Sequence, residues 1–361
     1  MSSGIEGVLH VIYASHGSEA DFERIEADLG AVAARSRRLV FVFEDVLPLH
    51  LLYERLDPSL RGLPPHVLLD DRTVRRNREE IARAYASAMS ELESVYRAWN
   101  VAPPERRATL SGEPGPFNRR LLLWAAANGA ELVRGETSLE AWLVQMSWIV
   151  ARQMGTAVAT GDPAAVWAEH RRECELLARA IQLRDLDLNA QLTRLLRVER
   201  RGHDALYVVG ALHSASGNLL TRGLKAIVHQ GHFIDDSGVR LVRALIEQRL
   251  DDEPPDVREW LETFVFVSDR LQPLARPAAS VSDIARLTHR LDGCAAARGV
   301  TLRQIVDSVI ADPAVRQSAG AFESRGLRVM TGVALVLRLI DGGFIARAEL
   351  ETDLRLQEAG L

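Results

Sequence analysis

The stretch Gly7–Ala14, GVLHVIYA, decides how this chain is interpreted. It is a short and mostly apolar run, and the small and polar residues Ser15–Ser18 follow it at once. A continuous apolar run bounded by turn residues is typical of a strand buried on both faces. Because such strands occur mainly in parallel sheets covered by helices, this stretch predicts an α/β fold.

Similar runs recur along the chain and predict further strands. Leu39–Phe43 (LVFVF) and Ala205–Val209 (ALYVV) are strong signals. Glu131–Arg134 (ELVR) is weaker, and Leu224–His229 (LKAIVH) is a fifth candidate strand. Long segments between them carry apolar residues at helical spacing. We expect helices over Thr73–Asn100, Thr137–Met154 and Pro163–Arg201, the last broken near Gln182–Asp187.

The character of the chain changes near residue 251, where DDEPPD gives a linker signal. We therefore expect an α/β core over residues 1–240, with a central, mostly parallel or mixed sheet flanked by helices. Residues 241–361 are expected to form an α-helical C-terminal appendage.

Composition limits the classes of function. The 361 residues carry a formal charge of -5, which argues against a dedicated nucleic-acid binder. Cys174 and Cys294 form no CxxC pair, and no apolar run is long enough to cross a bilayer. We expect a cytoplasmic protein with no nucleic-acid or membrane partner, acting on a small-molecule or peptide substrate. A homodimer is compatible with the sequence.

Three polar residues stand where predicted strands end. His16 follows the first strand within two residues, Glu44 directly ends the second, and His213 comes three residues after Gly210 at the end of the fourth. Open α/β sheets bind ligands just outside the carboxyl ends of their strands. We therefore predict a cleft built from His16, Glu44 and His213.

Two chemistries suit this trio. Two histidines and a glutamate can hold a divalent metal with open positions for water. Alternatively, one histidine takes a proton from water while the other, or Glu44, orients it. Arg184, which could pair with an anionic group, and Glu136, at the end of the third strand, are candidate substrate-binding residues. No HExxH, GxSxG, GxGxxG or Walker motif is present.

Four short islands resemble the erythromycin esterase, ChaN and TraB/TIKI superfamily. The first two are SHGSEADFERIEADL at 15–29 and LVFVFED at 39–45, which resemble the opening of the esterases. WAAANGAELVRGETSLEAW at 124–142 is similar to the TraB/TIKI branch, and RDLDLNAQLTRLL followed by ALYVVGALHS resembles the later part of the superfamily. The islands fall within residues 8–230 and keep the family's order.

The resemblance implies an α/β core with internally duplicated halves and a hydrolase acting on an ester, lactone or amide, of the esterase or metal-dependent peptidase class. It places His16, Glu44 and His213 at functional positions, with Glu136 and Arg184 near them. One departure is Tyr13, which stands where the esterase pattern has a glutamate. The alternatives are a haem- or metal-binding protein of the ChaN type and a non-catalytic interaction protein of the same fold. A role as a tailoring enzyme in a biosynthetic pathway suits the first.

Overall fold

The structure is a computed structural model that describes residues 7–14, 19–44, 47–103, 106–107, 116–135, 137–154, 163–229, 237–247, 262–263, 265–267, 270–271, 281–313, 339 and 342–344. Two compact units are present: the first holds the described parts of 1–147 and 176–248, the second those of 148–175 and 249–359. The predicted site residues His16 and Glu136 lie outside the described residues.

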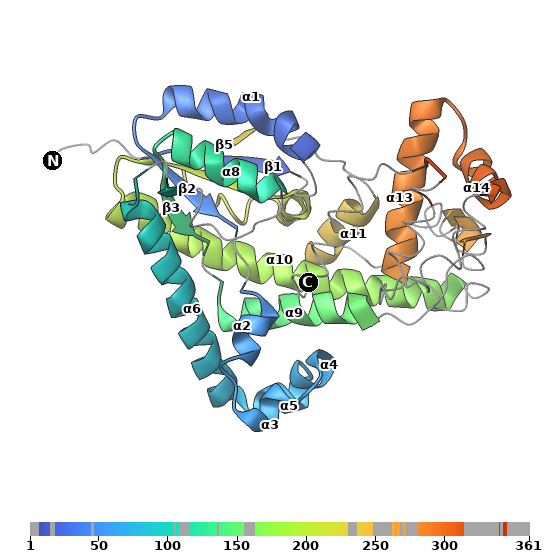
Figure 1. The fold of residues 1–361 in the computed structure, drawn as a ribbon, viewed down its shortest axis with the longest axis horizontal. Coiled ribbons are helices and arrows are strands. Elements are labelled where there is room, and N and C mark those ends of the chain that lie inside the picture. Colours follow the sequence, from blue (N-terminus) through green and yellow to red (C-terminus); the bar gives the residue numbers. More distant parts are fainter. Residues whose placement is uncertain are drawn as a thin grey trace. The chain divides into compact units, whose positions relative to one another are not determined.

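The first unit is built on a five-stranded parallel sheet, which confirms the predicted α/β class (Figure 1). The strand order is β3-β2-β4-β1-β5. The strands are β1 (Leu9–Ala14), β2 (Leu39–Phe43), β3 (Glu131–Arg134), β4 (Asp204–Gly210) and β5 (Ala226–His229). All five predicted strands are therefore present.

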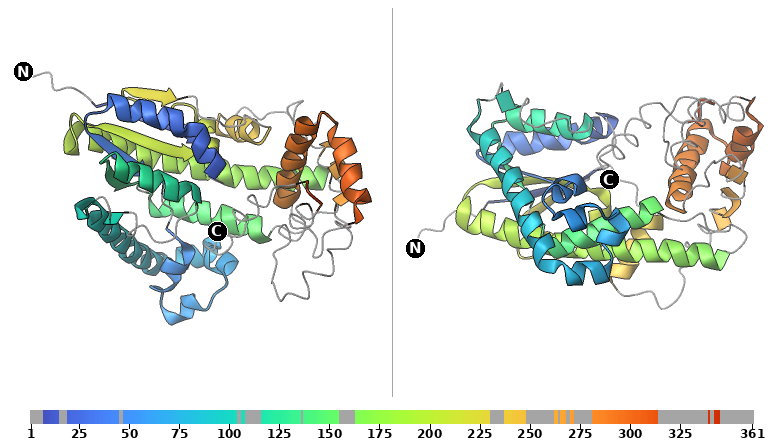
Figure 2. Two further views of the ribbon diagram at one scale, coloured as in Figure 1. Left: turned by 45° about the horizontal axis from the view of Figure 1, so that its top comes forward. Right: turned by 60° about the horizontal axis from the view of Figure 1, so that its bottom comes forward.

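Helices cover both faces of this sheet, as the continuous apolar strands require (Figure 1, Figure 2). On one face Ile12, Phe41 and Leu206 pack in a core cluster with residues of α1 (Glu19–Arg35) and α8 (Pro116–Ala127). On the other face, Val11, Val40 and Tyr207 pack with Leu188 and Leu192 of α10 (Pro163–Arg194).

Helix α10 corrects one prediction. The expected break near Gln182–Asp187 is wrong, because the helix continues to Arg194 and passes into a π-helical turn, η1 (Leu195–Glu199). The polar run that suggested a break instead places Arg184 and Asp185 on the side of α10 that faces the sheet. Both side chains are buried.

The remaining elements of the first unit connect the strands or follow them. They are α2 (Leu49–Tyr53), α3 (Pro58–Arg61), α4 (Pro65–Leu68), α5 (Asp71–Arg76), α6 (Arg78–Val101), the first part of α9 (Leu139–Met154), η2 (Ala211–Ser216) and α11 (Ser237–Ile246). The predicted helix over Thr73–Asn100 corresponds to the end of α5 and nearly all of α6.

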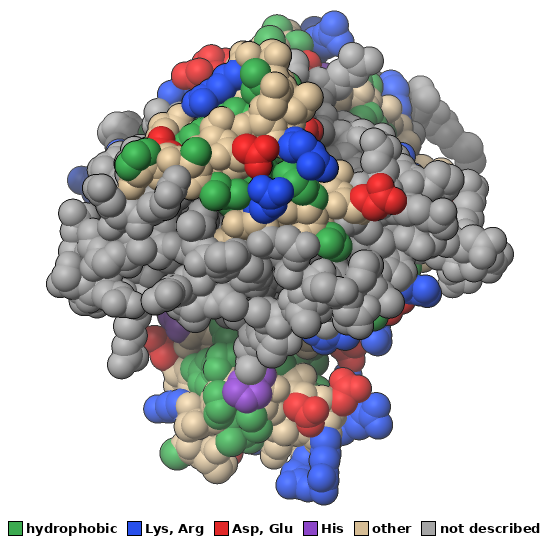
Figure 3. Space-filling view, turned by 90° about the vertical axis from the view of Figure 1, so that its right-hand side faces the viewer, with side chains coloured by type: hydrophobic (Ala, Val, Ile, Leu, Met, Phe, Trp, Pro, Cys, Tyr) green, Lys and Arg blue, Asp and Glu red, His purple; other side chains and the backbone are tan. Residues whose placement is uncertain are grey.

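The second unit is helical where it is described, as expected for the C-terminal region. Its two regular C-terminal helices are α13 (Val281–Arg298) and α14 (Leu302–Ala311), and a capping box between Thr301 and Gln304 begins the second. Figure 3 shows one face of the molecule, on which described side chains of both charge signs are intermixed with hydrophobic ones. Among the described residues, no helix combines the length and the apolar character needed to cross a membrane.

Substituting Gly7 is expected to loosen the junction of β1 and β4. A Cβ atom on Gly7 would lie 1.8 Å from the backbone oxygen of His203, so the backbone itself must move. We expect Gly7→Ala to lower the free energy of unfolding by about 1 to 3 kcal/mol in urea denaturation. Gly30→Ala is the control: it lies within α1 with open space around the added carbon and should raise that free energy by about 0.5 to 1 kcal/mol. Equal effects at the two positions would contradict the clash.

Candidate functional site

The strand order brings the predicted strand ends together. Strand β4 lies between β2 and β1, so the carboxyl ends that precede His16, Glu44 and His213 belong to three neighbouring strands. Ala14, the last residue of β1, pairs with Gly210 at the end of β4. Glu44 directly follows β2, and His213 lies on η2, the short 3-10 helix that leaves β4.

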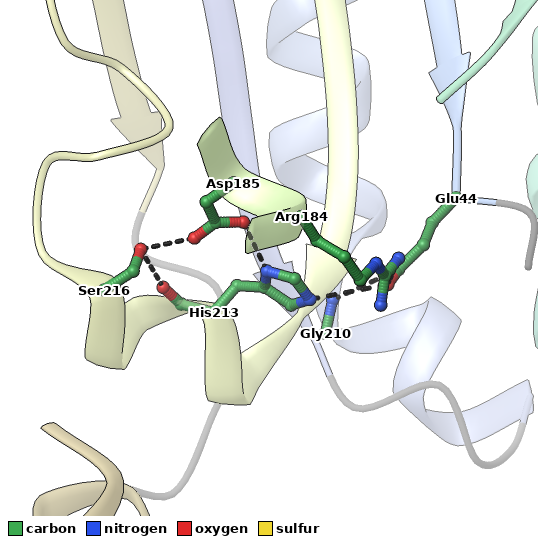
Figure 4. Close-up of polar contacts among 6 residues, drawn as sticks. All are labelled: Glu44, Arg184, Asp185, Gly210, His213 and Ser216. Carbon is green, nitrogen blue, oxygen red and sulfur yellow. Dashed lines mark hydrogen bonds and ion pairs between the residues drawn. The ribbon is translucent and has the colours of Figure 1, made fainter. Parts of the chain in front are cut away.

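Glu44 is held by a guanidinium and by the end of β4. Its Oε1 atom accepts a hydrogen bond of 2.5 Å from Nη2 of Arg184, and its Oε2 atom accepts one of 3.2 Å from the backbone N–H of Gly210. Figure 4 shows these contacts, with the Arg184 side chain reaching from α10 to the end of β2. Arg184, a predicted substrate-binding residue, is thus already paired, and its side chain is 8% exposed.

His213 stands between two carboxylates. Its Nδ1 atom lies 2.6 Å from Oδ1 of Asp185, and its Nε2 atom lies 3.5 Å from Oε1 of Glu44 (Figure 4). The Ser216 hydroxyl contacts the other Asp185 oxygen and also lies 2.9 Å from the backbone oxygen of His213. Because η2 carries both His213 and Ser216, one short turn sets the imidazole against Asp185. We call Glu44, Arg184, Asp185 and His213 the charged quartet.

The quartet keeps His213 protonated. Burial by itself acts to lower the pKa of His213, but the charges and hydrogen bonds of Asp185 and then Glu44 outweigh it and raise this pKa to about 9. At neutral pH the two cations of the quartet therefore balance its two anions. In this state His213 can donate a proton from Nε2, and it has no lone pair with which to accept one.

Tyr13 on β1 and Tyr207 on β4 interact electrostatically with the quartet. Burial, followed by the charge of Glu44, raises the pKa of Tyr207 well above its ordinary value. The Tyr207 hydroxyl has no hydrogen-bond partner among the described residues. Burial and the charge of Asp185 raise the pKa of Tyr13 to about 12, so both phenols are neutral hydroxyl groups at neutral pH. Where the esterase pattern has an acid, this chain therefore has a neutral phenol.

The two described members of the predicted metal trio do not fit a cation as they are arranged. The Arg184 guanidinium already binds the Glu44 carboxylate, and a protonated His213 has no lone pair for a metal or for haem iron. Among the residues that the structure describes, no group of three or more His, Cys, Asp or Glu side chains is arranged to hold a metal ion.

Sequence reasoning missed Asp185 and Ser216, and it did not anticipate that the site would be buried. Charged residues such as those of Arg184–Asn189 usually indicate a solvated helix face, but Asp185 is fully buried. The available signal was helical spacing: Leu188 lies four residues after Arg184 and Leu192 eight residues after it, so the arginine shares the apolar face of α10. A histidine at a strand end was also expected to face an open cleft, yet His213 is 4% exposed.

Comparison with known proteins identifies no relative of this chain. No family model, no curated protein and no solved structure matches the chain. The superfamily resemblance therefore stays a prediction.

The free energy of unfolding should depend on pH through His213. The pKa of His213 is about 9 in the folded protein against an ordinary value of 6.5, so the folded form retains a proton that the unfolded form releases. This stabilisation is complete below pH 6.5 and is lost as the pH rises through 9. We expect the free energy of unfolding to fall by up to about 3 kcal/mol across that window in urea titrations. His213→Gln should flatten the profile, and an unchanged profile in that variant would refute the assignment.

Proposed function

We propose that the chain is a hydrolase acting on an ester, lactone or amide at the carboxyl ends of β1, β2 and β4. The observation that carries the proposal is the His213 imidazole, which Asp185 holds at Nδ1 and which keeps its proton at neutral pH. A positioned and protonated imidazole is the group that a leaving alcohol or amine requires. The superfamily resemblance supports the same class of reaction.

His213 acts as the general acid in this proposal. Water attacks the carbonyl carbon and loses a proton to a general base, the carbon–oxygen or carbon–nitrogen bond breaks, and Nε2 of His213 gives its proton to the leaving atom. The base cannot be His213, because that imidazole is already protonated. His16, which follows the strand beside β4, is the residue that we propose as the base. Arg184 binds Glu44, and the charge and hydrogen bond of Glu44 in turn help to raise the pKa of His213.

Hydrolysis of a substrate panel tests the proposal. Purified protein is assayed at pH 7 with p-nitrophenyl esters, aliphatic lactones and anilides, and His16→Ala is assayed beside it. We expect turnover by the native protein, and a loss of about 10² to 10⁴ in rate for the variant, as is typical when a general base is removed. His66→Ala, an exposed histidine of α4, is the control and should keep full activity. Unchanged turnover in His16→Ala would exclude His16 as the base. No turnover of any of the three substrate classes by the native protein would refute the proposed hydrolase.

A further inference from the structure

A cavity of about 290 Å³ lies at the opposite ends of the strands from the charged quartet. Its walls come from the segments that lead into β2, β3 and β4, where each strand begins. Its volume is close to the lower end of the range for small-molecule sites. The side chains that matter here are Ser36, Arg37, Arg38, Glu131 and His203.

Two buried polar atoms of this cavity lack partners. The hydroxyl oxygen of Ser36 and the Nδ1 atom of His203 make no hydrogen bond with any residue that the structure describes. Buried polar groups are nearly always paired in folded proteins, and leaving one unpaired costs free energy. A ligand whose oxygen atoms reach Ser36 and His203 would supply the missing partners.

The cavity also concentrates positive charge in a chain of net charge -5. Arg37 and Arg38 are exposed, and their guanidinium groups make no hydrogen bond or ion pair within the described part of the chain. Glu131, the carboxylate of the wall, does not offset them, because both of its oxygens are bound by Arg200, one of them at 2.8 Å. Within the described residues, no carboxylate therefore pairs with Arg37 or Arg38.

Within the described residues, neither Arg37 nor Arg38 donates a side-chain hydrogen bond to the helices that end beside them. Helix α1 ends at Arg35, and the N–H of Ser36 already donates to the backbone oxygen of Val32 at 3.0 Å. The end of α8 is likewise closed by its own turn, in which Gly129 has a positive φ and its N–H donates to Ala126. Hydrogen bonds to these helix ends therefore do not occupy the two guanidinium groups, which leaves both available to an anion.

We propose that this cavity binds a small molecule that carries a phosphate or carboxylate group. Arg37 and Arg38 pair with the oxyanion, since guanidinium groups match the geometry of both anions. Ser36 and His203 hydrogen-bond the same group or the atoms next to it. The site is independent of the proposed hydrolase, because it uses none of the residues at the carboxyl ends of the strands.

Calorimetric titration of the full chain at low ionic strength tests this inference. The probes are inorganic phosphate, glucose 6-phosphate and citrate. Comparing the affinity for the two phosphates with that for citrate distinguishes phosphate from carboxylate recognition. We expect saturable binding of at least one probe, weakened about tenfold or more in the variant Arg37→Ala/Arg38→Ala and by a smaller factor in Ser36→Ala.

The matched control is Arg75→Ala/Arg76→Ala, which removes two exposed arginines from α5 and should leave the affinity unchanged. All four arginines are exposed, so both double variants should melt like the native protein. Two results would overturn the inference: no binding of any of the three probes, or equal affinity in the two double variants.

Discussion

Replacing Asp185 by alanine is expected to lower the free energy of unfolding by about 3 to 5 kcal/mol, because it leaves a buried cation without its partner. Asp185 is fully buried, and its two oxygens contact His213 and Ser216. Without it, the His213 imidazole must either stay charged in a core that no longer compensates the charge or release its proton. The first outcome leaves an unbalanced positive charge in the core, and the second leaves the imidazole without its partner at Nδ1.

Urea denaturation at pH 7 measures this loss. The control is Asp71→Ala on α5, where the carboxylate is 92% exposed and pairs with Arg75 at the surface. A surface pair of this kind contributes about 0 to 1 kcal/mol, so the control should unfold like the native protein. Asp185→Asn, which keeps the shape but not the charge, should lie between the two. A loss below about 1 kcal/mol in Asp185→Ala would show that the quartet does not stabilise the fold.

The second large effect is expected on turnover. If the proposed hydrolase is correct, His213→Gln should lower the rate of hydrolysis by about 10² to 10⁴, because glutamine fills similar space but cannot donate a proton to the leaving group. Rates are compared per folded molecule, since a residue that is 4% exposed also contributes to stability. Esters with good leaving groups, such as p-nitrophenolate, should lose less than alkyl esters because they need less help from an acid.

That dependence on the leaving group separates a proton donor from a residue that is only structural. If His213 has only a structural role, His213→Gln should lose the same fraction of activity toward every substrate, and that loss should follow the fraction of unfolded protein. Full turnover per folded molecule in His213→Gln would therefore exclude His213 as the proton donor. His16→Ala provides the comparison, because loss of a base should depend much less on the leaving group.

The strands were predictable because their signal is local. Leu39–Phe43 is an uninterrupted apolar run, and even the weak run Glu131–Arg134 forms a strand, β3, in the structure. The fold class also predicted that the strand ends would lie close together, because the carboxyl ends of parallel strands share one edge of the sheet. Glu44 and His213 could therefore be named as neighbours before their contact was known.

Local sequence pattern was enough to predict the α/β class, the five strands and the end of the sheet at which polar residues gather, since periodicity and apolar content act over a few neighbouring residues. The contact of Arg184 with Glu44, and those of Asp185 and Ser216 that hold His213, could be seen only in the folded chain. The Arg184–Glu44 contact joins residues 140 positions apart, and no local pattern records such a pairing. The charge state of His213 was settled in the same way, because burial and two carboxylates from distant parts of the chain together set its pKa.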